Sequence, residues 1–129
     1  MASVIFLDTH VIVWLYARGA RGLPAALGER LEREDDIRIS PMVRLELQYL
    51  KEIKRLNVAP ATILDELTFI MGLMICDTPF SAITRQAELE TWTRDPFDRI
   101  IVAQARLHGA PLVSKDETIR ANYPLAVWE

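Results

Sequence analysis

Short runs of apolar residues, each bounded by polar residues, recur along this chain. Residues 4–7 (Val-Ile-Phe-Leu) form the first run, which ends abruptly at Asp8, as expected for a buried strand of a parallel sheet. Similar runs predict strands at residues 37–39, 73–76 and 112–114, and a last, edge-like strand at 125–128.

Between these strands, apolar residues recur at helical spacing. They predict helices at residues 9–18, 24–35, 41–56, 61–71, 81–92 and 95–108, and one helical turn at 119–122. Strands that alternate with helices predict an α/β fold with a mostly parallel central sheet of about four to five strands flanked by helices. The length of 129 residues suits a single domain, residues 1–129.

Composition narrows the possible functions. The single cysteine, Cys76, excludes an internal disulfide and suits a reducing cytosol. The longest apolar run, residues 69–76, is too short to cross a membrane, and no secretory signal precedes the first strand; we therefore expect a cytoplasmic protein. The net charge of −3 argues against a general electrostatic nucleic-acid binder. The excess of basic residues in the segment 18–55 is nevertheless compatible with a local phosphate-binding face.

Two acids lie at or just after the ends of predicted buried strands. Asp8 ends the first strand, and Asp116 comes two residues after the strand at 112–114. In open α/β sheets, ligands bind at this carboxyl edge. Each acid also has a purely structural explanation, because an aspartate at this position can cap the helix that follows it.

Two further acids project from the inward faces of predicted helices. The helical neighbours of Glu46 are all apolar or aromatic, namely Met42, Val43, Tyr49 and Leu50. Asp98 similarly faces Ile101, Val102 and Ala105. The alternatives are a buried ion pair between Glu46 and an arginine, and a capping role for Asp98 together with Asp95.

We expect the four carboxylates, Asp8, Glu46, Asp98 and Asp116, to share one pocket. A pair of carboxylates about 5 Å apart repels by roughly 3 kcal/mol at an effective dielectric constant near 20. Protons or a cation must therefore compensate the charge. Oxygen ligands without cysteine or histidine favour Mg²⁺ or Mn²⁺.

Four segments of the chain resemble the PIN-domain ribonucleases, and most closely the toxins of VapBC-type toxin–antitoxin pairs. The segments are Leu-Asp-Thr-His-Val at 7–11, Ser-Pro-Met-Val-Arg-Leu-Glu-Leu at 40–47, Asp-Pro-Phe-Asp-Arg-Ile-Ile-Val-Ala-Gln-Ala at 95–105 and Leu-Val-Ser-Lys-Asp at 112–116. Carried across by position, the acidic cluster of the family falls on Asp8, Glu46, Asp98 and Asp116. Thr9 matches the small hydroxyl residue that supports the metal site, and Glu117 leaves the fourth assignment less secure.

The resemblance implies an endoribonuclease that uses Mg²⁺ or Mn²⁺ and acts as the toxin of a pair. It also implies a homodimer and a small cognate antitoxin that blocks the acidic pocket. A metal held by the carboxylates would activate water and stabilise charge on the phosphate. Arg44, Arg99 and Lys115 are candidate contacts for the phosphates of an RNA substrate.

Two other functions remain compatible with the sequence. One is a catalytically inactive PIN-like module that binds RNA or a protein partner. The other is a receiver-type signalling domain that binds Mg²⁺, for which Asp77 is the only candidate phosphate acceptor. A receiver-type domain requires paired acids after the first strand, whereas Asp8 stands alone there.

Overall fold

A parallel sheet of five strands, in the order β3-β2-β1-β4-β5, forms the centre of the computed structural model, which describes residues 3–129. The strands are β1 (Val4–Leu7), β2 (Asp36–Ile39), β3 (Met74–Ile75), β4 (Leu112–Val113) and β5 (Ala126–Val127). Every neighbouring pair runs parallel. The predicted α/β class, the strand number and the parallel arrangement are confirmed.

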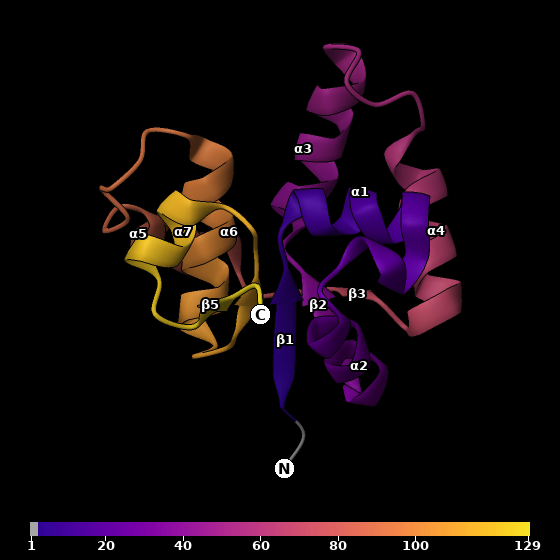
Figure 1. The fold of residues 1–129 in the computed structure, drawn as a ribbon. Coiled ribbons are helices and arrows are strands. Elements are labelled where there is room, and N and C mark those ends of the chain that lie inside the picture. The colour runs from indigo at the N-terminus through magenta and orange to yellow at the C-terminus, as the bar shows by residue number, and fades with distance from the viewer. Residues whose placement is uncertain (1–2) are drawn as a thin grey trace.

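Helices lie on either side of the central strand β1 (Figure 1). They are α1 (Thr9–Arg18), α2 (Ala25–Arg33), α3 (Pro41–Glu52), α4 (Pro60–Met71), α5 (Phe80–Ala87), α6 (Pro96–Leu107) and α7 (Glu117–Asn122), with a short 3₁₀ helix η1 (Gly19–Gly22) after α1. In Figure 1, α1 to α4 lie to the right of β1, and α5 to α7 lie to its left. Within residues 3–129, no helix is long and apolar enough to span a bilayer.

The order of the strands creates a crevice beside β1. After β1 the chain proceeds through β2 to β3, and it then crosses back so that β4 pairs with the other side of β1. Connections that leave neighbouring strands in opposite directions open a crevice at their carboxyl ends. Asp8 and Asp116 follow the two strands that flank this point.

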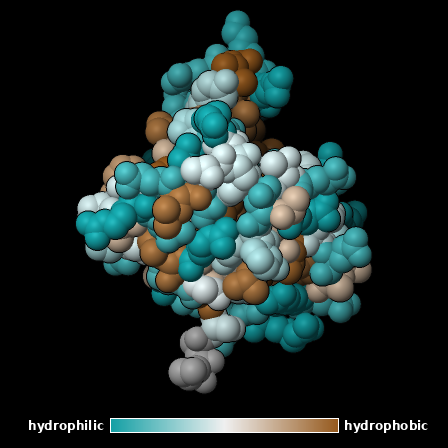
Figure 2. All heavy atoms as spheres, turned by 90° about the vertical axis from the view of Figure 1, so that its left-hand side faces the viewer, coloured by the Kyte–Doolittle hydropathy of each residue, from teal (hydrophilic) through white to brown (hydrophobic). Residues whose placement is uncertain are grey.

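Apolar residues hold the two halves of the molecule against β1. Ile5, Phe6 and Leu7 are almost completely buried in the main core, as the apolar run predicts. A second, smaller core between α5 and α6 contains Ile83 and Ile100. The outer face of this half is a mosaic of hydrophilic and hydrophobic residues (Figure 2). Ile101 and Val102 of α6 belong to the main core together with the residues of β1, so this packing fixes α6, and with it Asp98, relative to β1.

Two predicted elements differ from the structure because loops replace helical turns. The helix predicted to reach Leu56 ends at Glu52, because Lys54 adopts a left-handed conformation with φ of 64°. The helix predicted to reach Trp92 ends at Ala87. Trp92 instead lies in a loop, where its indole N–H donates a hydrogen bond of 2.7 Å to Glu90.

The third strand is also not the buried strand that its apolar sequence predicts. It lies at one edge of the sheet, and Met74 and Ile75 are 57% and 45% exposed. The last strand lies at the opposite edge, as predicted. The predicted turn at 119–122 is a two-turn helix that begins at Glu117.

Candidate active site

One pocket at the carboxyl end of the sheet contains all four acids that the sequence singles out. It has a volume of about 320 Å³, and its wall includes a fifth acid, Asp95. The acids come from four separate segments: the end of β1, the middle of α3, the start of α6 and the loop after β4. The structure thus brings Asp8, Glu46, Asp98 and Asp116 together, with Thr9 and His10 beside them.

Asp8 is the most deeply buried of these acids, with 3% of its surface exposed. One carboxylate oxygen accepts the backbone N–H of Thr9 at 2.8 Å, and this bond caps α1. The other oxygen accepts the hydroxyl of Ser114 at 2.7 Å. Burial raises the pKa of Asp8, while His10 and the bond from Ser114 act in the opposite direction. The carboxylate is therefore held in one orientation but is costly to ionise.

Glu46 is held by the residue that follows Asp8. The hydroxyl of Thr9 donates a hydrogen bond of 2.5 Å to Oε1 of Glu46. Burial raises the pKa of Glu46 to about 7, and the nearby carboxylates of Asp8 and Asp95 add to the effect. The alternative of an ion pair with an arginine is not observed for Glu46 among residues 3–129.

Asp98 occupies the first turn of α6 but does not cap it. The cap is Asp95, whose carboxylate accepts the N–H of Phe97 at 2.9 Å. Burial raises the pKa of Asp98 to about 8, and repulsion from Asp95, Asp8 and other acids of the pocket contributes further. An ionised Asp98 therefore requires positive charge nearby.

Asp116 serves as a cap and as part of the pocket wall. Its carboxylate accepts N–H groups of Thr118 at 2.8 Å and Ile119 at 3.1 Å at the start of α7. Its own N–H donates to the hydroxyl of Ser114 at 3.1 Å. Glu117 is exposed and does not line the pocket. Of the two adjacent acids, only Asp116 faces the cluster.

Ser114 and His10 support the cluster, although the sequence did not single them out for this role. Ser114 is fully buried and joins Asp8 to the backbone of Asp116. Nε2 of His10 accepts the N–H of Lys115 at 2.9 Å, and its Nδ1 lies 3.4 Å from Asp8. Because Nε2 accepts this bond, the ring proton lies on Nδ1 and faces the carboxylate. Ser114 lies 106 residues from Asp8 in the sequence, whereas His10 is a close neighbour of Asp8.

The basic residues that the sequence proposes as phosphate contacts do not line this pocket. Arg44 borders a different depression beside Pro60, and Arg99 donates hydrogen bonds to the carbonyl oxygens of Ala87 and Glu88. The ammonium group of Lys115 lies 5.7 Å from the centre of the Trp14 ring. Arg55, which is not among these candidates, lines the pocket instead.

The donor set fits a hard divalent cation better than any other group. Carboxylate oxygens dominate the polar wall, as a hard cation requires. Both oxygens of Asp8 accept hydrogen bonds, whereas Glu46, Asp98 and Asp116 each keep at least one oxygen without a hydrogen bond in the described chain. Within residues 3–129, no three acidic, histidine or cysteine side chains are already arranged to hold an ion. Burial, together with repulsion from the other acids, nevertheless raises the pKa values of Glu46 and Asp98, and a cation would favour their ionised forms.

A receiver-type domain is not supported by this geometry. Such a domain needs an acceptor aspartate beside the metal-binding acids. Asp77, the only candidate, follows the edge strand β3 and does not line the pocket. Glu46, which a receiver domain would leave unexplained, lies within it.

Comparison with known proteins identifies the family. The model of the PIN domain family matches residues 5–123. Ribonuclease VapC22 of Mycobacterium tuberculosis is 31% identical over 134 aligned positions, which cover 98% of this chain and 99% of the relative.

Two solved structures share the fold, each with a TM-score of 0.65 and 21% identity. One is VapBC2 of Rickettsia felis bound to a DNA fragment from its promoter, aligned over 98% of this chain and 97% of the other. The second is DNA-bound VapBC of Salmonella typhimurium, aligned over 100% and 98%. From the match to the family model and the relative of nearly equal length, the chain belongs to the PIN domain family, as a VapC-like member.

Proposed function

We propose that this protein is an endoribonuclease that depends on Mg²⁺ or Mn²⁺ and acts as the toxin of a toxin–antitoxin pair. The observation that carries the proposal is the convergence of four acids from distant segments on one pocket. Burial and mutual repulsion raise the pKa of Glu46 to about 7 and that of Asp98 to about 8. A relative named as a ribonuclease supports the choice of RNA as substrate.

The residues of the pocket divide into ligands and supports. Asp8, Glu46, Asp98 and Asp116 would hold the cation through carboxylate oxygens. Thr9 fixes Glu46 through its hydroxyl. When bound, a divalent cation supplies Lewis-acid stabilisation of the charge that develops on the phosphate during hydrolysis. The described side chains supply no activated nucleophile at the pocket, and the reaction requires none, because water attacks the phosphorus.

RNA cleavage with and without metal tests the proposal. The wild-type protein should cleave RNA with Mg²⁺ or Mn²⁺ and lose this activity in EDTA. Asp98→Asn should reduce cleavage by at least a hundredfold, because it removes a ligand without disturbing a hydrogen bond of the described structure. The matched control is Asp65→Asn on α4, an exposed acid outside the pocket. Equal cleavage by the wild type and Asp98→Asn would refute the proposed metal site, and no cleavage by either protein would point to the inactive binding module instead.

We further propose a homodimer and a cognate antitoxin that covers the acidic pocket. The structural neighbours of this chain are VapBC complexes. Five acids in the pocket wall form an anionic surface that favours a basic segment of a protein partner. Sedimentation of the purified chain tests the dimer. Co-expression with the product of the adjacent reading frame tests the partner: a true antitoxin should abolish cleavage, and an unrelated protein should not.

A further inference from the structure

The end of α3 adopts a backbone conformation that projects Arg55 from the helix. The N–H of Arg55 donates to the carbonyl of Leu50 at 2.9 Å, and that of Lys54 donates to Lys51 at 3.1 Å. This pair of bonds is the Schellman motif, which usually has glycine at the left-handed position. Here Lys54 occupies it, as the only residue other than glycine with positive φ within residues 3–129. The turn therefore stores steric strain that a helix ending in glycine would avoid.

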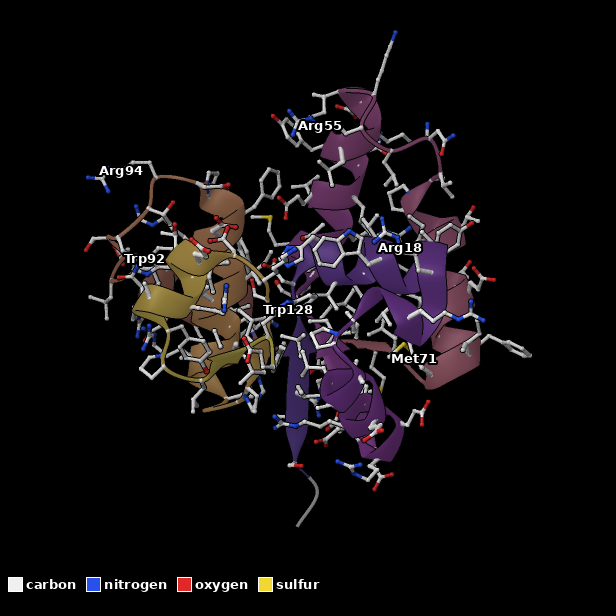
Figure 3. All side chains as sticks on the ribbon, in the orientation of Figure 1. Arg18, Arg55, Met71, Trp92, Arg94 and Trp128 are labelled. Carbon is white, nitrogen blue, oxygen red and sulfur yellow. The ribbon has the colours of Figure 1, made fainter. Side chains whose placement is uncertain are left out.

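This turn gives the acidic pocket a cationic rim. Arg55 and Leu56 both line the pocket that contains the acids. In Figure 3, Arg55 extends from the end of α3 towards the side on which α6 and α7 lie. Its side chain is exposed. It forms no hydrogen bond and no ion pair in the described part of the chain, although five carboxylates share its pocket.

The other basic residues around the site are either engaged or turned elsewhere. Arg99 is occupied by two backbone carbonyl oxygens, and Lys115 lies over the Trp14 ring. Arg94, which is labelled in Figure 3, extends away from the pocket and donates to the carbonyl of Thr91 at 3.0 Å. Arg55 is thus the pocket-lining guanidinium of the described chain that is available to a ligand.

We propose that Arg55 binds an RNA phosphate next to the one that is cleaved. This inference rests on the proposed ribonuclease function. The acids on the pocket floor repel the RNA backbone, whereas a guanidinium at the rim offers paired N–H donors that match phosphate oxygens. Because the Arg55 side chain forms no ion pair in the described chain, it can bind a phosphate without first breaking one. Arg55 therefore aligns the RNA so that the adjacent phosphate reaches the carboxylates.

Steady-state cleavage of a single-stranded RNA oligonucleotide tests the proposal. Arg55→Met should raise KM about tenfold, as expected for the loss of a charge-assisted bond, while kcat changes less than twofold. The dependence of log kcat/KM on log salt concentration should become shallower by about 0.7, the value for one phosphate contact on a single strand. Arg55→Lys should restore the salt dependence and part of the affinity, because the charge returns without the paired donors.

The matched control is Arg85→Met on α5. Arg85 is also exposed, and it forms no side-chain hydrogen bond or ion pair in the part of the chain that the structure describes; its removal should leave KM and the salt dependence unchanged. Circular dichroism and Mn²⁺ titration of each variant exclude misfolding and an altered metal site as causes. If Arg55→Met matches the wild type in KM and salt slope, or shows a changed Mn²⁺ affinity as its only effect, the assignment is wrong while the ribonuclease function stands. Absence of cleavage by the wild type overturns both.

Discussion

Replacement of Asp98 by asparagine should stabilise the metal-free protein at high pH. Burial and repulsion raise the pKa of Asp98 to about 8, against about 4 for an aspartate in the unfolded chain. Without screening, the difference between these pKa values corresponds to a loss of about 5–6 kcal/mol in the free energy of unfolding at pH values above 8. Asp98 is only partly buried, and solvent screening reduces the penalty. We therefore expect Asp98→Asn to raise the free energy of unfolding at high pH by about 1–2 kcal/mol.

The size of this stabilisation depends on pH. Because the folded chain holds this proton more tightly than the unfolded chain, the favourable contribution is complete below pH 4 and is lost as pH rises towards 8. The wild type and Asp98→Asn should therefore unfold alike at pH 4. At pH 9 in EDTA the variant should melt roughly 4–8 °C higher, as estimated for 129 residues. Differential scanning calorimetry across this range measures the difference directly.

Metal and a control variant separate this effect from a general gain in stability. Mn²⁺ should raise the melting temperature of the wild type at pH 8 and should raise that of Asp98→Asn much less. Asp65→Asn, which removes an exposed carboxylate outside the pocket, should follow the wild type at every pH. If Asp98→Asn is no more stable than the wild type at pH 9 without metal, burial and repulsion do not raise the pKa of Asp98 as described.

Three further predictions follow from the same structure. Lys54→Gly should stabilise the chain by about 0.5–1 kcal/mol in urea unfolding, because glycine adopts positive φ without steric strain; destabilisation would contradict this. Ser114→Ala should destabilise it by about 1–3 kcal/mol in the same assay, because buried Asp8 loses a hydroxyl donor; an unchanged midpoint would exclude that role. Mn²⁺ affinity, measured by calorimetric titration, should rise between pH 6 and 9, because Glu46 and Asp98 have pKa values of about 7 and 8 and must lose protons to bind; a flat profile would refute it.

The acids could be predicted from the sequence because each has a local signature. Asp8 interrupts an apolar run, and Glu46 has apolar neighbours at every helical position around it. Both signals depend only on residues within one turn or one strand. The meeting of Asp8 and Asp116 in one pocket follows from the parallel sheet, since the carboxyl ends of β1 and β4 lie side by side.

The supporting contacts could not be predicted because they join residues that are distant in sequence. The bond from Ser114 to Asp8 spans 106 residues, and no local pattern marks a serine at the end of a strand as its donor. The position of Arg55 at the pocket could not be predicted for a different reason. The helical spacing of polar residues continues through the end of α3 without a glycine or proline to stop it, so the left-handed turn at Lys54 has no signal.

Edge strands show a similar limit. Residues 73–76 are as apolar as a buried strand, but Met74 and Ile75 lie at the open edge of the sheet with large exposed fractions. Hydrophobicity alone does not reveal the order of strands, because that order depends on how the connecting helices pack. The apolar pattern therefore predicted the strand correctly but its burial wrongly.

The central claim is that four acids from separate segments form one site for a divalent cation. Anomalous diffraction from a crystal soaked in Mn²⁺ tests it most directly. We predict a manganese peak in the pocket, bonded to carboxylate oxygens of Asp8, Glu46, Asp98 or Asp116, and loss of that peak in Asp98→Asn. A pocket without manganese at millimolar concentration, with the acids paired to arginines instead, would contradict the account.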